Sequence, residues 1–185
     1  VGARPEGISV NHNSNRIYIV NSVDNTISVI DGFTNKVTNT ISVGKFPMRA
    51  GVNTATNRIY VSNFNDNTVS VINGSDNTTI ATITAGGSPL GIAVNSLTNF
   101  IYAANVTTRT LSVINGGATS TTNAIVNVVP IGSFPKGIGI NPSTNTIYVA
   151  NSDNNTVTVI NGSTNNVIAT VSVGRFPHEL GVNPS

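Results

Sequence analysis

Short apolar runs alternate with clusters of asparagine, aspartate, serine and glycine along the whole chain. Between residues 144 and 177 three such runs follow one another, I-Y-V-A, T-V-T-V-I and V-I-A-T-V-S-V, and a fourth run, G-I-G-I, precedes them. Runs of this length that are rich in β-branched residues predict strands, and the polar clusters between them predict hairpin turns. The pattern therefore predicts a four-stranded antiparallel meander, which cannot bury both of its faces alone.

This meander repeats through the chain. Successive x-Pro pairs lie 42, 42, 46 and 42 residues apart, at Pro5, Pro47, Pro89, Pro135 and Pro177, and the tyrosines of the second run follow the same period, at Tyr18, Tyr60, Tyr102 and Tyr148. A period in the low forties is what four short strands and their turns require. We assign the repeats to about residues 5–46, 47–88, 89–134 and 135–176, followed by an extra first strand at 177–183. The longer third repeat has its four extra residues after Asn115, in an outer hairpin.

The four runs of a repeat differ in composition, which indicates their depth in the fold. The first is rich in glycine and small residues, the second and third are almost continuously apolar, and the fourth alternates threonine and serine with valine and isoleucine. Continuous apolar runs are typical of strands that are covered on both faces. Between the third and fourth runs, a type I′ turn with two positive φ angles is predicted by Asp31-Gly32, Asn73-Gly74, Asn115-Gly116 and Asn161-Gly162.

Four such sheets pack either radially or in a linear stack, and meanders of this length favour the radial arrangement. The sequence therefore predicts an all-β protein, a β-propeller of four blades of about 42 residues that forms an open, partial ring or a four-bladed ring. The whole of 1–185 is interpreted as one propeller domain or propeller segment. The tyrosines are interpreted as packing residues between blades whose hydroxyls find a turn carbonyl.

The repeated sequences I-Y-V-x-N, N-T-V-S-V-I-(N/D) and V-G-x-x-P-x-G-(I/V)-x-V-N are similar to the YVTN-type β-propeller repeats of archaeal and bacterial surface-layer and secreted proteins. The resemblance implies a propeller with a structural or adhesive role, outside the cell or on its surface. Similar repeats also occur in propellers that resemble lactonases, streptogramin lyases and the haem-d1 domain of nitrite reductases. Related propellers usually close with seven blades, whereas this chain supplies four.

Composition excludes several kinds of partner and site. Charged residues make up 9% of the chain, and the net charge of +2 comes from scattered lysines and arginines, so we expect no binding to nucleic acid or to an anionic membrane. Cysteine is absent, which excludes disulfides and cysteine-based metal or redox sites. No apolar run approaches the roughly 18 residues of a membrane span. We expect no cofactor and no bound metal.

The loops that lead into the first strands carry the most varied polar residues. In propellers these strands line the central channel, and the loops open on the face where ligands commonly bind. We therefore predict a ligand site at the channel mouth, formed by Arg4, Glu6, Arg49, Lys136, His178 and Glu179. A histidine and a glutamate beside arginines can polarise or deprotonate a substrate, but the set is far below a catalytic triad or a metal site, and we assign no catalytic residue.

Two further patterns have a chemical and a structural interpretation. The loops around Asp24, Asp66 and Asp153 resemble calcium loops, but each contributes one carboxylate where calcium needs six to eight oxygens, which favours asparagine-rich turns that satisfy their own backbone. Sequons for N-glycosylation, which matter only in an exported protein, occur at Asn73, Asn77, Asn105, Asn154 and Asn161.

Taken together, these features favour a non-catalytic structural or adhesive module, extracellular or on the cell surface, that mediates protein or glycan interactions. An enzyme resembling the lyase or lactonase propellers, and a propeller that binds a small ligand in its channel, are the alternatives. Because the chain holds one first strand too many for a ring of four blades, unpaired edges at its ends predict self-association with other protein chains.

Overall fold

Residues 1–118 and 124–183 are described by a computed structural model, and they form sixteen strands in four sheets. The sheets consist of β1 (Pro5–Asn11), β2 (Arg16–Asn21), β3 (Thr26–Asp31) and β4 (Lys36–Ser42); β5 (Pro47–Asn53), β6 (Arg58–Asn63), β7 (Thr68–Asn73) and β8 (Thr78–Thr84); β9 (Pro89–Asn95), β10 (Phe100–Asn105), β11 (Thr110–Asn115) and β12 (Ile125–Pro130); and β13 (Pro135–Asn141), β14 (Thr146–Asn151), β15 (Thr156–Asn161) and β16 (Asn166–Ser172). The described residues contain no helix, and hence none that is long and apolar enough to cross a membrane.

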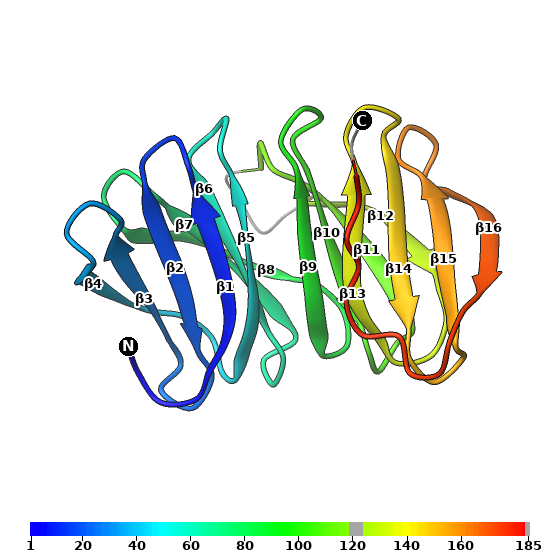
Figure 1. Ribbon diagram of the computed structural model, residues 1–185, viewed down its shortest axis with the longest axis horizontal. Helices are drawn as coiled ribbons and strands as arrows, with labels where there is room; N and C mark the ends of the chain where they lie inside the picture. The colour runs from blue at the N-terminus through cyan, green and yellow to red at the C-terminus, as the bar shows by residue number, and fades with distance from the viewer. Residues whose placement is uncertain (119–123, 184–185) are drawn as a thin grey trace.

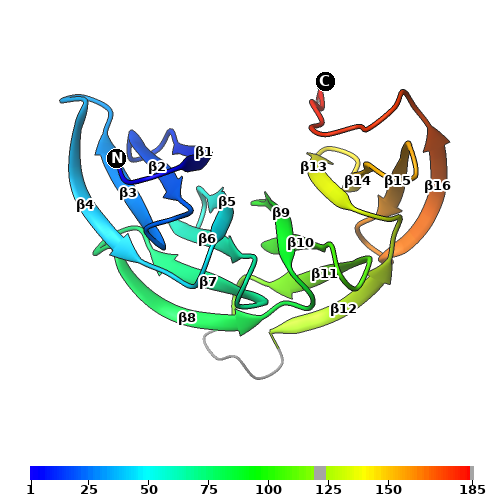
Figure 2. The ribbon, with the colours of Figure 1, turned by 90° about the horizontal axis from the view of Figure 1, so that it is seen from below.

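Within each sheet the strands lie in chain order and pair antiparallel with their neighbours (Figure 1). The sheets stand side by side as the blades of a propeller, with β1, β5, β9 and β13 innermost and β4, β8, β12 and β16 outermost (Figure 2). Successive innermost strands contact one another. The prediction of an all-β propeller with four-stranded blades is confirmed, and the blades form an open arc rather than a closed four-bladed ring.

The hairpin turns follow a different geometry from the predicted type I′ turn. The loop between β3 and β4 has four residues, the backbone N–H of Asn35 donates to the Asp31 carbonyl oxygen at 2.8 Å, and the positive φ angle of 56° belongs to Asn35. The corresponding Asn77 and Asn165 have φ angles of 60° and 58°. Asparagine tolerates this left-handed conformation better than other side-chain-bearing residues. The prediction of positive φ at the Asn-Gly dipeptides is therefore wrong.

These turns still require glycine, because a side chain at the glycine position would clash with a neighbouring asparagine. A Cβ atom on Gly162 would lie 2.5 Å from Oδ1 of Asn145 and 2.7 Å from the Asn145 carbonyl oxygen. The same crowding by an asparagine of the first hairpin occurs at Gly32, Gly74 and Gly116. The third hairpin of each blade therefore packs directly on the first.

The core consists of three apolar clusters, each between two adjacent blades. Tyr18, Tyr60 and Tyr102 lie in these clusters and are buried, as predicted, whereas Tyr148 is half-buried because it faces the open end of the arc. The hydroxyl of Tyr60 donates to a turn carbonyl, that of Gly116, at 3.2 Å. The buried hydroxyls of Tyr18 and Tyr102 have no protein partner, so the expectation of a turn carbonyl fails for them.

Residues 177–183 were predicted as an extra first strand, and they occupy its place without forming a strand. The segment runs beside β13 on the side that faces away from the third blade (Figures 1 and 2). The hydroxyl of Ser152 donates to the Pro177 carbonyl oxygen at 2.6 Å, and Ser22 makes the same bond at 2.6 Å to the first strand of the second blade, at Pro47. The segment is hereafter called the terminal segment. It has the position of an innermost strand, but no second strand to pair with.

Candidate functional site

At the channel mouth, Arg49 links its own first strand to the first strand of the first blade and to the terminal segment. Its side chain leaves β5, where the register shifts by a bulge between Pro47 and Arg49. One guanidinium nitrogen donates to the backbone carbonyl of Glu6 at 3.0 Å, and another lies 3.0 Å from Oε1 of Glu179. Arg49 therefore connects the first blade, the second blade and the terminal segment.

The other charges at the mouth pair locally and are partly or largely exposed. Arg4 and Glu6 form an ion pair at 2.7 Å, and Nδ1 of His178 lies 3.9 Å from Oε1 of Glu179. The side chains of His178 and Glu179 are 59% and 64% exposed, so water screens their charges. Lys136 lies instead with its ammonium 5.2 Å from the ring centre of Phe134, in its own loop.

An open cavity of about 340 Å³ lies beside these contacts. It is lined by Glu6, Gly7, Ile8, Arg49, Ala50, Ile92 and Glu179. Three of the predicted residues, Glu6, Arg49 and Glu179, are brought together there. The structure does not place Arg4, Lys136 or His178 among the residues that line the cavity. The guanidinium of Arg49 pairs there with the carboxylate of Glu179 and donates to the backbone carbonyl of Glu6, whose own carboxylate pairs with Arg4.

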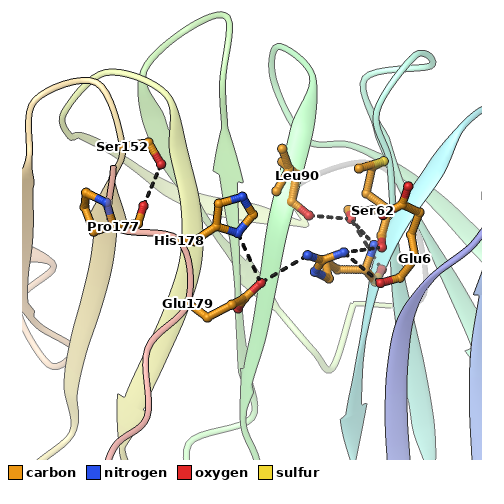
Figure 3. Close-up of polar contacts among 9 residues, drawn as sticks. Glu6, Ser62, Leu90, Ser152, Pro177, His178 and Glu179 are labelled. Atoms are coloured by element: carbon orange, nitrogen blue, oxygen red, sulfur yellow. Dashed lines mark hydrogen bonds and ion pairs between the residues drawn. The ribbon is translucent and has the colours of Figure 1, made fainter. Parts of the chain in front are cut away.

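Behind the cavity, the buried Ser62 orders the backbone that carries Arg49. Its hydroxyl donates to the Leu90 carbonyl oxygen at 2.9 Å and accepts from the backbone N–H of Arg49 at 3.1 Å (Figure 3). Sequence reasoning did not select this serine, because its position in the second run looks like an ordinary interior one. The equivalent residues in the other blades are Val20, Ala104 and Ala150. A serine where the other repeats have an apolar residue is the sequence signal that could have identified Ser62.

The aspartate loops hold the linkers between blades. Asp24 accepts from the backbone N–H of Ala3 at 2.7 Å, and Asp66 accepts from that of Lys45 at 2.7 Å. Asp153 lies 3.4 Å from the hydroxyl of Ser133. The part of the chain that the structure describes contains no cluster of three or more residues that are suited to hold a metal ion.

The five sequons differ in their accessibility. Asn154 is exposed, and Asn73, Asn77 and Asn161 are partly exposed in or beside turns. Asn105 is 0% exposed, and its amide nitrogen donates to Ser112 and Thr110. A buried amide with two hydrogen bonds is not open to an attached glycan, so Asn105 does not fit the role proposed from the sequence.

Away from the channel, one groove recurs at the same place in three blades. It lies between the linker that enters a blade and the outer part of that blade, and its volume is about 340, 430 and 310 Å³ in the first, second and fourth blades. Equivalent positions line each copy: Asp24, Thr26, Ser28, Val37 and Thr40; Asp66, Thr68, Ser70, Thr79 and Thr82; Asn154, Thr156, Thr158, Val167 and Thr170. We call these the rim grooves.

The rim grooves were missed from the sequence because three separate segments form each one. Every copy is lined by an Asp or Asn side chain, at least three hydroxyl-bearing residues and the backbone of a linker glycine, Gly2, Gly44 or Gly132. One hydroxyl in each groove, that of Ser28, Ser70 or Thr158, is buried and accepts from an asparagine of its own blade. In the sequence, the threonines of the fourth run indicate only the wetter face of an outer strand. Their recurrence at the same place, Thr40, Thr82 and Thr170, is the signal that could have found the grooves.

No protein-family model matches the chain, and no curated protein matches it in sequence. Solved structures do share its fold. A hydrazine synthase from Kuenenia stuttgartiensis superposes with a TM-score of 0.83 at 21% identity, over 91% of this chain and 49% of that one. A functionally unknown protein from Desulfotomaculum acetoxidans gives a TM-score of 0.77 at 16% identity, over 90% of this chain and 55% of that one. The chain thus spans about half the length of these structures, and the likeness is one of fold.

Proposed function

We propose that the protein is a non-catalytic adhesive module, extracellular or on the cell surface, that binds neutral hydroxyl-rich glycans in its rim grooves. The observation that carries the proposal is the recurrence of one groove, with equivalent residues, in three blades. Repeated weak sites on one rigid scaffold suit a repetitive ligand, because simultaneous engagement raises the avidity without any new contact.

The chemistry of the grooves fits an uncharged polyol better than an ion. Threonine and serine hydroxyls both donate and accept, and the Asp or Asn oxygens accept, so together they complement the hydroxyl groups of a sugar. Val37 and Val167 add an apolar wall in two of the grooves. The low charge of the chain, 9%, gives little attraction for anionic polymers.

The proposed location rests on the resemblance to YVTN-type repeats and on the uncharged, hydroxyl-rich surface. In this setting the polar residues of the channel mouth have a structural role. The Arg49 guanidinium donates to the Glu6 backbone carbonyl and pairs with the Glu179 carboxylate, and these contacts hold the first strands of the first two blades and the terminal segment together.

Binding to immobilised neutral polysaccharides, with mannan and dextran as probes, tests the proposal. The triple variant Thr40→Val, Thr82→Val and Thr170→Val removes one exposed hydroxyl from each rim groove at nearly constant volume, and we expect it to weaken binding by about tenfold through lost avidity. The matched control is Thr38→Val, Thr144→Val and Thr164→Val, exposed threonines outside the grooves. Equal binding by the two triple variants, or no binding by the parent, would overturn the proposal.

A second candidate function is favoured by the cavity at the channel mouth, where the Arg49 guanidinium contacts the Glu179 carboxylate and the Glu6 backbone carbonyl. This site suits a small polar ligand, either bound without turnover or converted as in the lyase or lactonase propellers. A hydrolase and lyase screen with the parent and with Arg49→Gln distinguishes the two functions. Turnover that disappears in Arg49→Gln and persists in the rim-groove variant would assign the function to the channel mouth.

A further inference from the structure

Two outer hairpins contain the same reactive dipeptide in the same local sequence. The second and fourth blades both read V-I-N-G-S, with the pairs Asn73-Gly74 and Asn161-Gly162. Both asparagines end the third strand of their blade, both are partly exposed, and both turns have four residues. The pair Asn115-Gly116 of the third blade lies in a longer hairpin and does not match these two. Differences in reactivity between the two matched pairs therefore arise from the folded structure.

An asparagine that is followed by glycine can lose the nitrogen of its side-chain amide. The backbone nitrogen of the glycine attacks Cγ of the asparagine, the C–N bond of the amide breaks, and the proton lost by the glycine nitrogen leaves with the amide group as ammonia. Water then opens the resulting succinimide ring at one of its two carbonyl groups, which gives aspartate or isoaspartate. Glycine favours the first step because it has no side chain and its backbone is conformationally free.

Hydrogen bonds restrain the attacking nitrogen in both hairpins. The backbone N–H of Gly74 donates to the Asn57 carbonyl oxygen at 2.8 Å, and that of Gly162 donates to the Asn145 carbonyl oxygen at 2.8 Å. Oδ1 of each reactive asparagine also accepts from the backbone N–H two residues further on, at 3.0 Å in the second blade and 2.9 Å in the fourth. Attack requires these bonds to break, so the reaction needs the hairpin to open locally.

An arginine of the preceding blade holds one of the two hairpins closed. The guanidinium of Arg16 donates to the Gly74 carbonyl oxygen at 2.8 Å and lies 3.5 Å from Oδ1 of Asn77, so it spans this turn from the outside. The equivalent residue before the fourth blade is Phe100, which has no hydrogen-bond donor on its side chain and packs against apolar residues. Opening of the second blade's hairpin must therefore break a charge-assisted bond that Phe100 cannot provide in the fourth blade.

Bonds within the turns do not offset this difference. Nδ2 of Asn73 donates to the exposed Asp76 at 3.0 Å, and Oδ1 of Asn161 accepts a second bond, from the backbone N–H of Thr164 at 3.1 Å. Each asparagine thus has one additional bond inside its own turn. The contact with the preceding blade is what distinguishes the two hairpins.

The first blade shows that aspartate is compatible with this turn. There the reactive position is occupied by Asp31, and its Oδ1 accepts from the backbone N–H groups of Phe33 at 3.0 Å and Thr34 at 2.8 Å. An aspartate formed from Asn161 has the equivalent donors in its own turn. Isoaspartate instead adds one carbon to the main chain of a four-residue turn and disrupts it.

We propose that Asn161 is a site of spontaneous deamidation, and that Arg16 protects Asn73 from the same reaction by holding its turn closed from the neighbouring blade. Conversion of Asn161 to aspartate preserves the turn and lowers the net charge of +2 by one. Conversion to isoaspartate opens the third hairpin of the fourth blade. The inference does not depend on a glycan ligand.

Site-resolved mass spectrometry of aged protein tests this inference. The protein is made without N-glycans, because a glycan on Asn161 would block its amide, and is incubated in mildly alkaline buffer, both folded and in denaturant. In denaturant we expect equal rates at the two asparagines, since they share the sequence V-I-N-G-S. In the folded protein both rates should fall, and Asn161 should react about three- to tenfold faster than Asn73, since water weakens a partly exposed bond to a charged group.

Exchange of the residue that holds the turn tests the mechanism. Arg16→Met keeps the apolar part of the side chain and removes the guanidinium, so it should raise the rate at Asn73 to that at Asn161 and leave Asn161 unchanged. Phe100→Arg, the reciprocal variant, should slow the reaction at Asn161 alone. The matched control is Lys45→Met, which removes an exposed cation elsewhere and should change neither rate.

Three results would contradict the inference. Equal rates at Asn73 and Asn161 in the folded parent would mean that the arginine gives no protection. An increase at both sites in Arg16→Met would mean that the arginine acts on overall stability rather than on one turn. Equal rates in the folded and denatured protein would mean that the bonds from Gly74 and Gly162 do not restrain the attacking nitrogen.

Discussion

The hydroxyl of Tyr60 donates to the carbonyl oxygen of Gly116 at 3.2 Å, which ties the second strand of one blade to the outer turn of the next. Arg58 reaches the same carbonyl oxygen through its guanidinium, and Arg16 makes the equivalent contact with Gly74 at 2.8 Å one blade earlier. The tyrosine rings fill the space between blades while these polar groups satisfy the turns. Blade-to-blade packing is therefore both apolar and directional.

Truncation of the tyrosines should depend on the position of the blade. Tyr60→Ala removes a fully buried ring and should lower the free energy of unfolding by about 3 to 5 kcal/mol, whereas Tyr148→Ala, on the half-covered face of the fourth blade, should lower it by about 1 to 2 kcal/mol. Urea denaturation measures both losses. Equal losses would mean that the fourth blade is covered as completely as the second.

The stability of the third hairpins should depend on the asparagine with positive φ. Asn165→Ala places an alanine at a φ of 58° and should cost about 1 kcal/mol, and Asn165→Gly, which relieves that strain, should cost less. Gly162→Ala should cost about 1 to 3 kcal/mol, because its Cβ would press on Asn145. Chemical denaturation of the three variants gives the order. A larger loss for Asn165→Gly than for Asn165→Ala would contradict the turn geometry.

Acid should destabilise the protein through two turn aspartates. Hydrogen bonds from the backbone and side chain of Thr34 lower the pKa of Asp31, and those from the side chain and backbone of Thr78 lower the pKa of Asp76. Because the folded pKa lies below the unfolded one, the stabilisation is present above the unfolded pKa of about 3.9 and is lost as the pH falls through the folded pKa. Thermal melts between pH 7 and pH 2 should show a smaller decline in the double variant Asp31→Asn with Asp76→Asn.

Alkaline pH should destabilise the protein through the buried tyrosines. Burial raises the pKa of Tyr18, Tyr60 and Tyr102, and nearby arginines partly offset the shift for Tyr18 and Tyr60. Since the folded pKa lies above the unfolded value, this stabilisation is present below about pH 10 and is lost as the pH rises through the folded pKa. An ultraviolet titration should show phenolate formation that coincides with unfolding. Reversible ionisation of all tyrosines in the folded protein would refute the burial argument.

The ion pair between Arg49 and Glu179 should be weak and sensitive to salt. With the side chains 25% and 64% exposed, a double-mutant cycle with Arg49→Gln and Glu179→Gln should give a coupling of about 0.2 to 1 kcal/mol at low ionic strength, and less in 1 M salt. The cycle reports on the seating of the terminal segment. A coupling that is unchanged by salt would mean that the pair is shielded from water.

Much of the fold followed from the sequence because its interactions are local. The I-Y-V and N-T-V-S-V-I runs set strands that pair with their immediate neighbours in the chain, and the spacing of Tyr18, Tyr60 and Tyr102 gave the period of the blades. The polar turns located every hairpin. The predicted turn type was wrong because the Asn-Gly dipeptide is also the usual composition of a type I′ turn. In the structure, glycine is needed at position 162 because Asn145 of another hairpin leaves no room for a side chain.

The candidate sites were less predictable, since each depends on contacts between distant segments. Arg49 and Glu179 are 130 residues apart, and their meeting depends on the curvature of the arc. Lys136, equally prominent in the sequence, turns to Phe134 of its own loop. The prediction of a buried Tyr148 assumed that every blade has a following neighbour, which the open arc does not supply.

Chain order within the sheets also determines how the protein can be built during synthesis. Because each sheet runs β1-β2-β3-β4, or its equivalent, a blade has all of its strands as soon as its own forty or so residues have left the ribosome. Each new blade then finds a finished template, the face of the preceding blade that it covers, and needs no segment that is still to be translated. The nascent chain thus matures blade by blade, and throughout elongation the surface most in need of protection from aggregation is the corresponding face of the youngest blade.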